Sequence, residues 1–140
     1  MKSHFFFAAL TRLLAVANLA NLSAQTSFKL VVTHVKTQTV DDNGRFGEYS
    51  KWKDCQTMGT VDISNGMHLK ILTSTPHDID MYEETSQKSN TANNSYELEG
   101  RALDANGKEV SIGLYVKYDN VIHIAIHYSD RRYLFECYRR

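Results

Sequence analysis

The chain has 140 residues, of which 42% are hydrophobic and 23% charged, and its formal net charge at pH 7 is zero. A neutral chain lacks the basic surface with which proteins contact nucleic-acid phosphates, so nucleic acid is excluded as a partner. The length suits one domain, and a single proline without long helical periodicity favours a β-rich one.

The N-terminal segment has the layout of a secretory signal peptide. Lys2 gives a positive start, residues 5–22 are mostly apolar, and small residues end the segment at Ala24. A membrane-spanning helix is the alternative, but Arg12 lies near its centre, and a span needs ~20 clean apolar residues. We therefore expect cleavage after Ala24.

This prediction divides the chain into a signal peptide, 1–24, and a single all-β domain, 25–140, that contains no membrane span. Without Lys2 and Arg12 the domain has 14 basic and 16 acidic side chains, a net charge of −2. We expect the mature protein to be exported, to the periplasm or to the extracellular space.

After residue 25, short runs rich in Val, Ile, Thr and Tyr alternate with turn residues, a pattern typical of antiparallel sheets. The predicted strands cover 28–36, 58–63, 67–73, 95–103, 109–117, 121–128 and 132–138, with a weaker eighth near 78–83. We expect an up-and-down antiparallel meander of seven to eight strands, forming a small barrel or strongly curved sheet, because closure removes exposed edges. A two-sheet sandwich is the alternative.

The turn at Asn65-Gly66 tests the strand register. A two-residue turn there would pair Val61 with Lys70 and mix core and solvent on one face. A three-residue loop over 64–66 pairs Val61 with Leu69 instead. Because a shift of one residue moves every side chain to the other face, the apolar match favours the longer loop.

The same choice holds at two other turns, 105–107 and 118–120, where it pairs Leu98 with Leu114 and Leu114 with Ile124. The third loop residue is Gly or Asn each time, which tolerates the left-handed conformation that a bulged turn needs. The predicted core is Phe28, Leu30, Val32, Val61, Ile63, Leu69, Ile71, Leu98, Ile112, Leu114, Val116, Ile122, Ile124, Ile126, Tyr133 and Phe135.

His123 and His127 are candidate metal ligands by residue type, but this register puts them on the outer face, with His123 beside Glu136. Residues four apart on a strand are ~13 Å apart, whereas zinc–imidazole bonds are ~2 Å long, so the two cannot share an ion. The acidic run HDIDMYEE places Asp78 and Asp80 on one face ~7 Å apart, but no calcium loop follows, and we expect a solvated edge or loop. We predict no metal site.

Two cysteines remain in the domain, Cys55 and Cys137. An even pair in an exported chain suggests one disulfide, here tying the long loop to the last strand and worth up to roughly 4 kcal/mol. Zinc is a poor alternative without C-x-x-C spacing. No nucleophile–base motif or phosphate-binding loop occurs, so we expect no enzyme and no cofactor.

The connection TQTVDDNGRFGEYSKWKDCQ is long for a compact domain, and its length marks it as functional or mobile. It contains Phe46, Tyr49 and the only Trp, Trp52, among charged residues. Aromatic residues on such a loop form a contact surface or cap a barrel, although Trp52 can equally plug the end of the core. With Tyr96, these three are the candidate ligand- or partner-binding residues.

The SAQ export boundary, the stretch THVKTQTVDDNGRFGEYSKW and the run of short hairpins resemble small exported β-proteins of Gram-negative bacteria that have no assigned function. The sequential strands are also similar in layout to lipocalin-like barrels, without a lipocalin motif such as G-x-W near the first strand.

Two functions remain open. The first is a non-enzymatic binding protein that holds a small apolar ligand inside a barrel, where Gly59, Gly100 and Ala102 on the inner face leave room. The second is an interaction protein that uses the 40–56 aromatic loop to contact a partner or host macromolecule. The partner is thus an unknown small molecule or protein.

Overall fold

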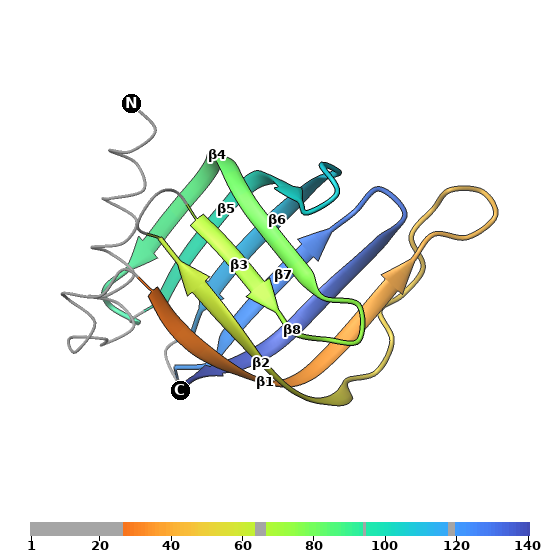
Figure 1. Cartoon of the computed structure of the whole chain (residues 1–140). Coiled ribbons are helices and arrows are strands. Elements are labelled where there is room, and N and C mark those ends of the chain that lie inside the picture. The colour runs from red at the N-terminus through yellow and green to blue at the C-terminus, as the bar shows by residue number, and fades with distance from the viewer. Residues whose placement is uncertain (1–26, 64–66, 94, 118–119) are drawn as a thin grey trace.

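The computed structural model describes residues 27–63, 67–93, 95–117 and 120–140. These residues form eight antiparallel strands, each paired with the next, and the last pairs with the first to close a barrel (Figure 1). The strands are β1 (Ser27–Thr39), β2 (Lys53–Asp62), β3 (Met67–Ile71), β4 (His77–Asn90), β5 (Ser95–Asp104), β6 (Glu109–Val116), β7 (Ile122–His127) and β8 (Arg131–Arg139). The predicted meander barrel is confirmed, and the sandwich alternative is wrong. Nowhere in these ranges is there a helix long and apolar enough to cross a membrane.

The strand registers agree with those predicted from the apolar pattern. Val61 lies opposite Leu69, and Leu114 lies opposite both Leu98 and Ile124. The third residues of two loops have the expected positive φ, +79° at Gly107 and 67° at Asn120. The 64–66 loop itself and residues 118–119 lie outside the described residues.

Large apolar side chains fill the barrel interior. An eight-stranded barrel is just wide enough for its inward side chains to meet, which is why the centre is packed. All the predicted core residues are buried except Tyr133, which is half-buried and packs against the core. The space expected beside Gly100 is occupied, because a Cβ there would lie 2.7 Å from the Met81 sulfur and 2.5 Å from the Glu83 carbonyl oxygen.

The acidic segment belongs to a long central strand, and the predicted edge or loop is wrong. β4 pairs with β3 over residues 77–81 and with β5 over residues 79–90, so Asp78 and Asp80 lie within paired sheet, while beyond Met81 the strand pairs with β5 alone. His77, Ile79 and Met81 alternate toward the core, while Asp78 and Asp80 remain on the outer face.

The long connection is shorter than the sequence pattern indicates, because β1 continues to Thr39 and β2 begins at Lys53. Part of the connection also bonds back to β1: the amide of Ser50 donates to the Thr37 carbonyl and that of Gly47 to the Thr39 carbonyl. A bulge between Val32 and His34 shifts the register of β1 against both neighbours.

Candidate functional site: a pocket at the barrel mouth

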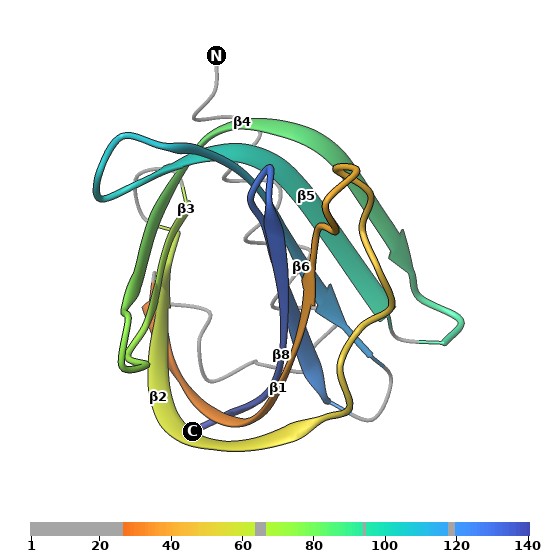
Figure 2. The same ribbon diagram turned by 90° about the vertical axis from the view of Figure 1, so that its right-hand side faces the viewer.

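The connections that follow β1, β3, β5 and β7 gather at one end of the barrel, as the meander requires (Figure 2). At this end lies an open pocket of about 510 Å³, which we call the mouth pocket. Its walls come from the end of β1, the start of β2 and residues 72–75; His77, Tyr133 and Phe135 complete it. The mouth pocket therefore joins segments far apart in the sequence.

An aromatic cluster forms the floor of the mouth pocket. The rings of Tyr133 and Phe135 are nearly parallel, 12° apart in plane, with centroids 6.1 Å from each other. The His77 imidazole meets both rings edge-on, at 4.8 Å from Tyr133 and 5.6 Å from Phe135. Such contacts fix ring orientation, so the half-buried Tyr133 ring is held in place by Phe135 and His77, which are both buried.

The registers of β1, β4 and β8 direct these side chains inward. Phe135 lies opposite Val35 and Ile124, and Val35 packs against the buried core. His77 lies opposite Ile71, a fully buried core residue. Because residues directly opposite share one face of a sheet, all of them point into the barrel.

His77 is a buried histidine, 7% exposed. Burial lowers the pKa of His77 below its ordinary value of 6.5, the positive charge of Arg131 lowers this pKa further, and the negative charge of Asp104 opposes the shift. The imidazole is therefore neutral at pH 7, able both to donate and to accept a hydrogen bond.

Stability should fall in mild acid because of His77. As the pH falls through about 6.5, His77 is protonated in the unfolded chain, whereas in the folded protein it stays neutral until the pH reaches its lower pKa. Proton binding therefore favours the unfolded state over this range. Urea unfolding between pH 7.5 and 5 should show a smaller loss of stability for His77→Gln than for the wild type, by at most about 1.4 kcal/mol per pH unit. His127, whose pKa burial also lowers, contributes to both proteins. Equal slopes would contradict this account of His77.

The predicted disulfide is not formed, since Cys55 and Cys137 are free thiols. Cys55 is on β2 and Cys137 on β8, and β1 runs between these strands and pairs with both. Strands two positions apart are roughly 9–10 Å apart, beyond the ~7 Å that a disulfide spans between Cα atoms. The sequence pattern puts Cys55 in the long loop, whereas the structure fixes it on β2, on the far side of β1 from Cys137.

The two thiols differ in access. Cys55 is half-buried and lines the mouth pocket, whereas Cys137 is fully buried in the core. Burial raises the pKa of Cys55, and burial, with smaller effects of Cys55 and Glu136, raises the pKa of Cys137 to about 12. Both are therefore protonated, weakly nucleophilic thiols at neutral pH.

Iodoacetamide should accordingly alkylate Cys55 in the folded protein and reach Cys137 only after denaturation. Peptide mass spectrometry of protein treated with and without urea measures the two sites separately. Equal alkylation of both in the native protein, or a peptide pair linked through sulfur, would refute the assignment of one accessible and one buried thiol.

The aromatic residues of the connection lie against the outer wall of the barrel and do not line the mouth pocket. The Arg132 guanidinium lies 3.8 Å from the Phe46 ring centroid, and the Lys36 ammonium lies 5.2 Å from that of Tyr49 and 4.7 Å from that of Trp52. Cation–π contacts of this kind hold the connection on the strands. Trp52 remains 38% exposed.

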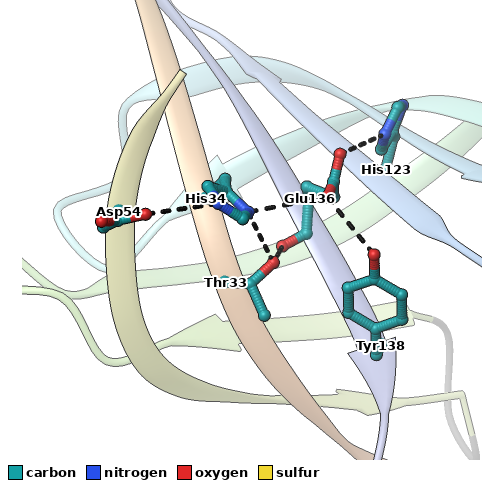
Figure 3. A network of polar contacts seen from close by, with 6 residues as sticks. All are labelled: Thr33, His34, Asp54, His123, Glu136 and Tyr138. Atoms are coloured by element: carbon teal, nitrogen blue, oxygen red, sulfur yellow. Dashed lines mark hydrogen bonds and ion pairs between the residues drawn. The ribbon is translucent and has the colours of Figure 1, made fainter.

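Four polar residues, His34, Asp54, His123 and Glu136, form what we call the outer histidine cluster (Figure 3). The Trp52 ring packs against its two histidines, with centroids 6.5 Å from His34 and 5.9 Å from His123. The Glu136 carboxylate lies between the two imidazoles, 3.6 Å from His34 Nδ1 and 3.5 Å from His123 Nε2. Asp54 lies 3.3 Å from His34 Nε2. The cluster links β2, β1, β8 and β7 on their outer side, and the predicted neighbours His123 and Glu136 do meet.

Tyr96, the fourth candidate binding residue, is fully buried in the core and accepts a hydrogen bond of 3.0 Å from Gln87 Nε2. The sequence-based candidates thus do not gather at one site. Sequence reasoning missed the mouth pocket, although the alternation of His77, Ile79 and Met81 is a period-two signal that predicts His77 to face inward.

In the part of the chain that the structure describes, no three His, Cys, Asp or Glu side chains are placed to hold a metal ion. The fold and the mouth pocket define the protein as a small closed meander barrel with a filled centre and an open pocket at one end. No family model, curated protein or solved structure matches the chain. The resemblance to small exported β-proteins therefore stays a prediction.

Proposed function

We propose that this protein is an exported, non-enzymatic binding protein that holds a small, largely apolar ligand in the mouth pocket. The observation that carries the proposal is the pocket of about 510 Å³ over a preformed aromatic floor. Pockets for small molecules have about 300–1,000 Å³, are lined mainly by apolar and aromatic side chains and contain a few placed polar groups. The ligand lies at the mouth because side chains fill the centre.

A binding role fits the chemistry of this pocket better than catalysis does. Its thiol, Cys55, has a pKa raised by burial and is a poor nucleophile. His77 contacts aromatic rings, and among the described residues no carboxylate forms a hydrogen bond with it. The remaining lining combines apolar and aromatic side chains with threonine, serine and glutamine, groups that bind a ligand but do not activate it.

Export is supported by the position of the barrel in the chain. β1 begins at Ser27, so cleavage after Ala24 leaves all eight strands intact. Fractionation of the native host should place a form lacking residues 1–24 in the periplasm or the medium. An intact N-terminus on the cytoplasmic protein would contradict the export proposal.

The binding proposal is tested by native mass spectrometry of protein purified from its own host, which should retain a small molecule. Val35→Trp, which fills the mouth pocket from β1, should abolish retention, and Ser74→Trp at the exposed rim should weaken it. Val31→Trp is the matched control, because Val31 lies on the same strand between two buried residues and faces outward. A bare wild-type protein, or equal retention by all variants with unchanged melting temperatures, would refute the proposal.

A second candidate function is contact with a macromolecule through the 40–56 loop, favoured by the exposure of Trp52. The Trp52 ring makes a cation–π contact with Lys36 on the barrel wall. This contact covers part of the ring, so less of its surface is available to a partner. A crosslinked partner that is lost in Trp52→Ala but kept in Val35→Trp would support this function over the first.

A further inference from the structure

The charge at the rim of the mouth pocket indicates the class of ligand. Lys53 is the first residue of β2 and lies directly opposite Val35, whose side chain packs against the core. Lys53 therefore stands on the inner face, and it lines the mouth pocket while remaining exposed to solvent. Its ammonium group sits where the pocket meets water.

Within the described ranges no carboxylate forms an ion pair with Lys53. The neighbouring residue, Asp54, is the other charged side chain of the lining, but it lies opposite His34, and its carboxylate is 3.3 Å from His34 Nε2 on the outer side. The remaining lining side chains are neutral, including His77 at pH 7. Lys53 is thus the one positively charged side chain of the lining and stands on the inner face, whereas the Asp54 carboxylate is turned to the outer face.

The floor and the rim together suit a molecule with two different ends. Tyr133 is half-buried, stacks on the buried Phe135 ring and is met edge-on by His77, so its ring is the fixed aromatic surface that a ligand ring can contact. A carboxylate at the solvent side would accept a charge-assisted hydrogen bond from Lys53, stronger than a neutral one. A lysine acts as a point charge, and the lining offers no arginine or second lysine with which it could bind a doubly charged phosphate.

We infer that the ligand is a small aromatic carboxylate, with its ring against Tyr133 and its carboxylate at the Lys53 ammonium. This inference rests on the proposed function, because it names the ligand class of the same pocket. The ring supplies the apolar contact, and the charge selects acids over neutral molecules of the same shape.

The test is calorimetric titration at pH 7.5 and low ionic strength with two probes that share one ring system, 1-naphthoate and 1-naphthalenemethanol. The acid should bind about tenfold more tightly than the alcohol, since one charge-assisted contact distinguishes them. Lys53→Met should remove this difference by weakening naphthoate alone, and Lys53→Arg should keep it. Lys51→Met is the matched control, because Lys51 is an exposed lysine two residues away that does not line the pocket.

The outcomes separate the inference from the function on which it rests. Equal binding of acid and alcohol, or an unchanged preference in Lys53→Met, would overturn the inference and leave the binding function standing. Failure of both probes to bind, together with a bare protein from the host, would overturn the binding function itself. Tighter binding of 1-naphthylmethylamine than of naphthoate would also overturn the inference.

Discussion

Replacing Gly100 by alanine is expected to destabilise the barrel by about 3 kcal/mol, at the upper end of the range for overpacked sites. A Cβ at this position would lie 2.5 Å from the Glu83 carbonyl oxygen and 2.7 Å from the Met81 side chain. The methionine can move, but the carbonyl belongs to the β4 backbone that pairs with β5. Equilibrium denaturation in urea measures the loss as a lower transition midpoint.

The matched control is Gly47→Ala in the β1–β2 connection. There a Cβ would meet only the Thr39 carbonyl oxygen, at 3.9 Å, which is an ordinary contact. We expect a change of no more than about 0.5 kcal/mol. If Gly47→Ala and Gly100→Ala lowered the free energy of unfolding equally, there would be room for a methyl group at Gly100, contrary to the structure.

Truncating Phe135 to alanine is expected to cost about 3–5 kcal/mol, because it removes a fully buried ring and leaves a cavity. The same change removes the ring on which Tyr133 stacks, so the Tyr133 ring loses its fixed position and binding at the mouth pocket should be lost as well. Thermal and urea unfolding measure the first effect, and titration with 1-naphthoate below the lowered melting temperature measures the second.

Tyr138→Ala on the same strand controls for the loss of an aromatic residue. Tyr138 is 41% exposed, and its hydroxyl lies 3.4 Å from the Glu136 carboxylate. Its truncation should cost less than about 1 kcal/mol and leave binding unchanged. A protein that tolerated Phe135→Ala as well as Tyr138→Ala would not have the core described above.

The sequence predicts the strand registers well where apolar residues alternate without interruption. A register shift of one residue would turn all the apolar side chains of a strand from the core to solvent, which is costly. The pairs Val61–Leu69 and Leu114–Ile124 follow from this cost. A three-residue loop is the short connection that keeps these apolar residues paired on the core side, and its residue types suit such a turn. Turn chemistry and burial therefore predict the same register.

The mouth pocket could not be predicted in the same way because a bulge changes the phase of β1. Simple alternation from Leu30 and Val32 would place His34 inward and Val35 outward. The bulge after Val32 reverses this: His34 joins the outer histidine cluster and Val35 enters the mouth pocket. A bulge of this kind depends on pairing with both neighbouring strands, which the sequence of β1 does not encode locally.

The start of β2 was missed for a related reason. Lys53 is exposed and follows charged residues, so its sequence surroundings are typical of a loop. It becomes part of a strand because Val35 lies opposite it in the ladder. Sequence patterns identify buried positions by their hydrophobicity. A residue at the rim of a pocket points to the inner face of the sheet but is exposed to solvent, so its side chain can be polar and gives no such signal.

The central claim is that small ligands bind at the barrel mouth, and amide chemical-shift mapping tests it most directly. Titration of isotope-labelled protein with 1-naphthoate should shift the resonances of residues 53–57, 72–77 and 133–135, which form the walls and floor of the pocket. Resonances near Tyr96 and Val116, which are buried in the core and line no part of this pocket, should stay in place. Saturable shifts at the mouth segments are the predicted result. Shifts confined to the outer wall around Tyr49 and Trp52, or no saturable shift anywhere, would contradict the claim.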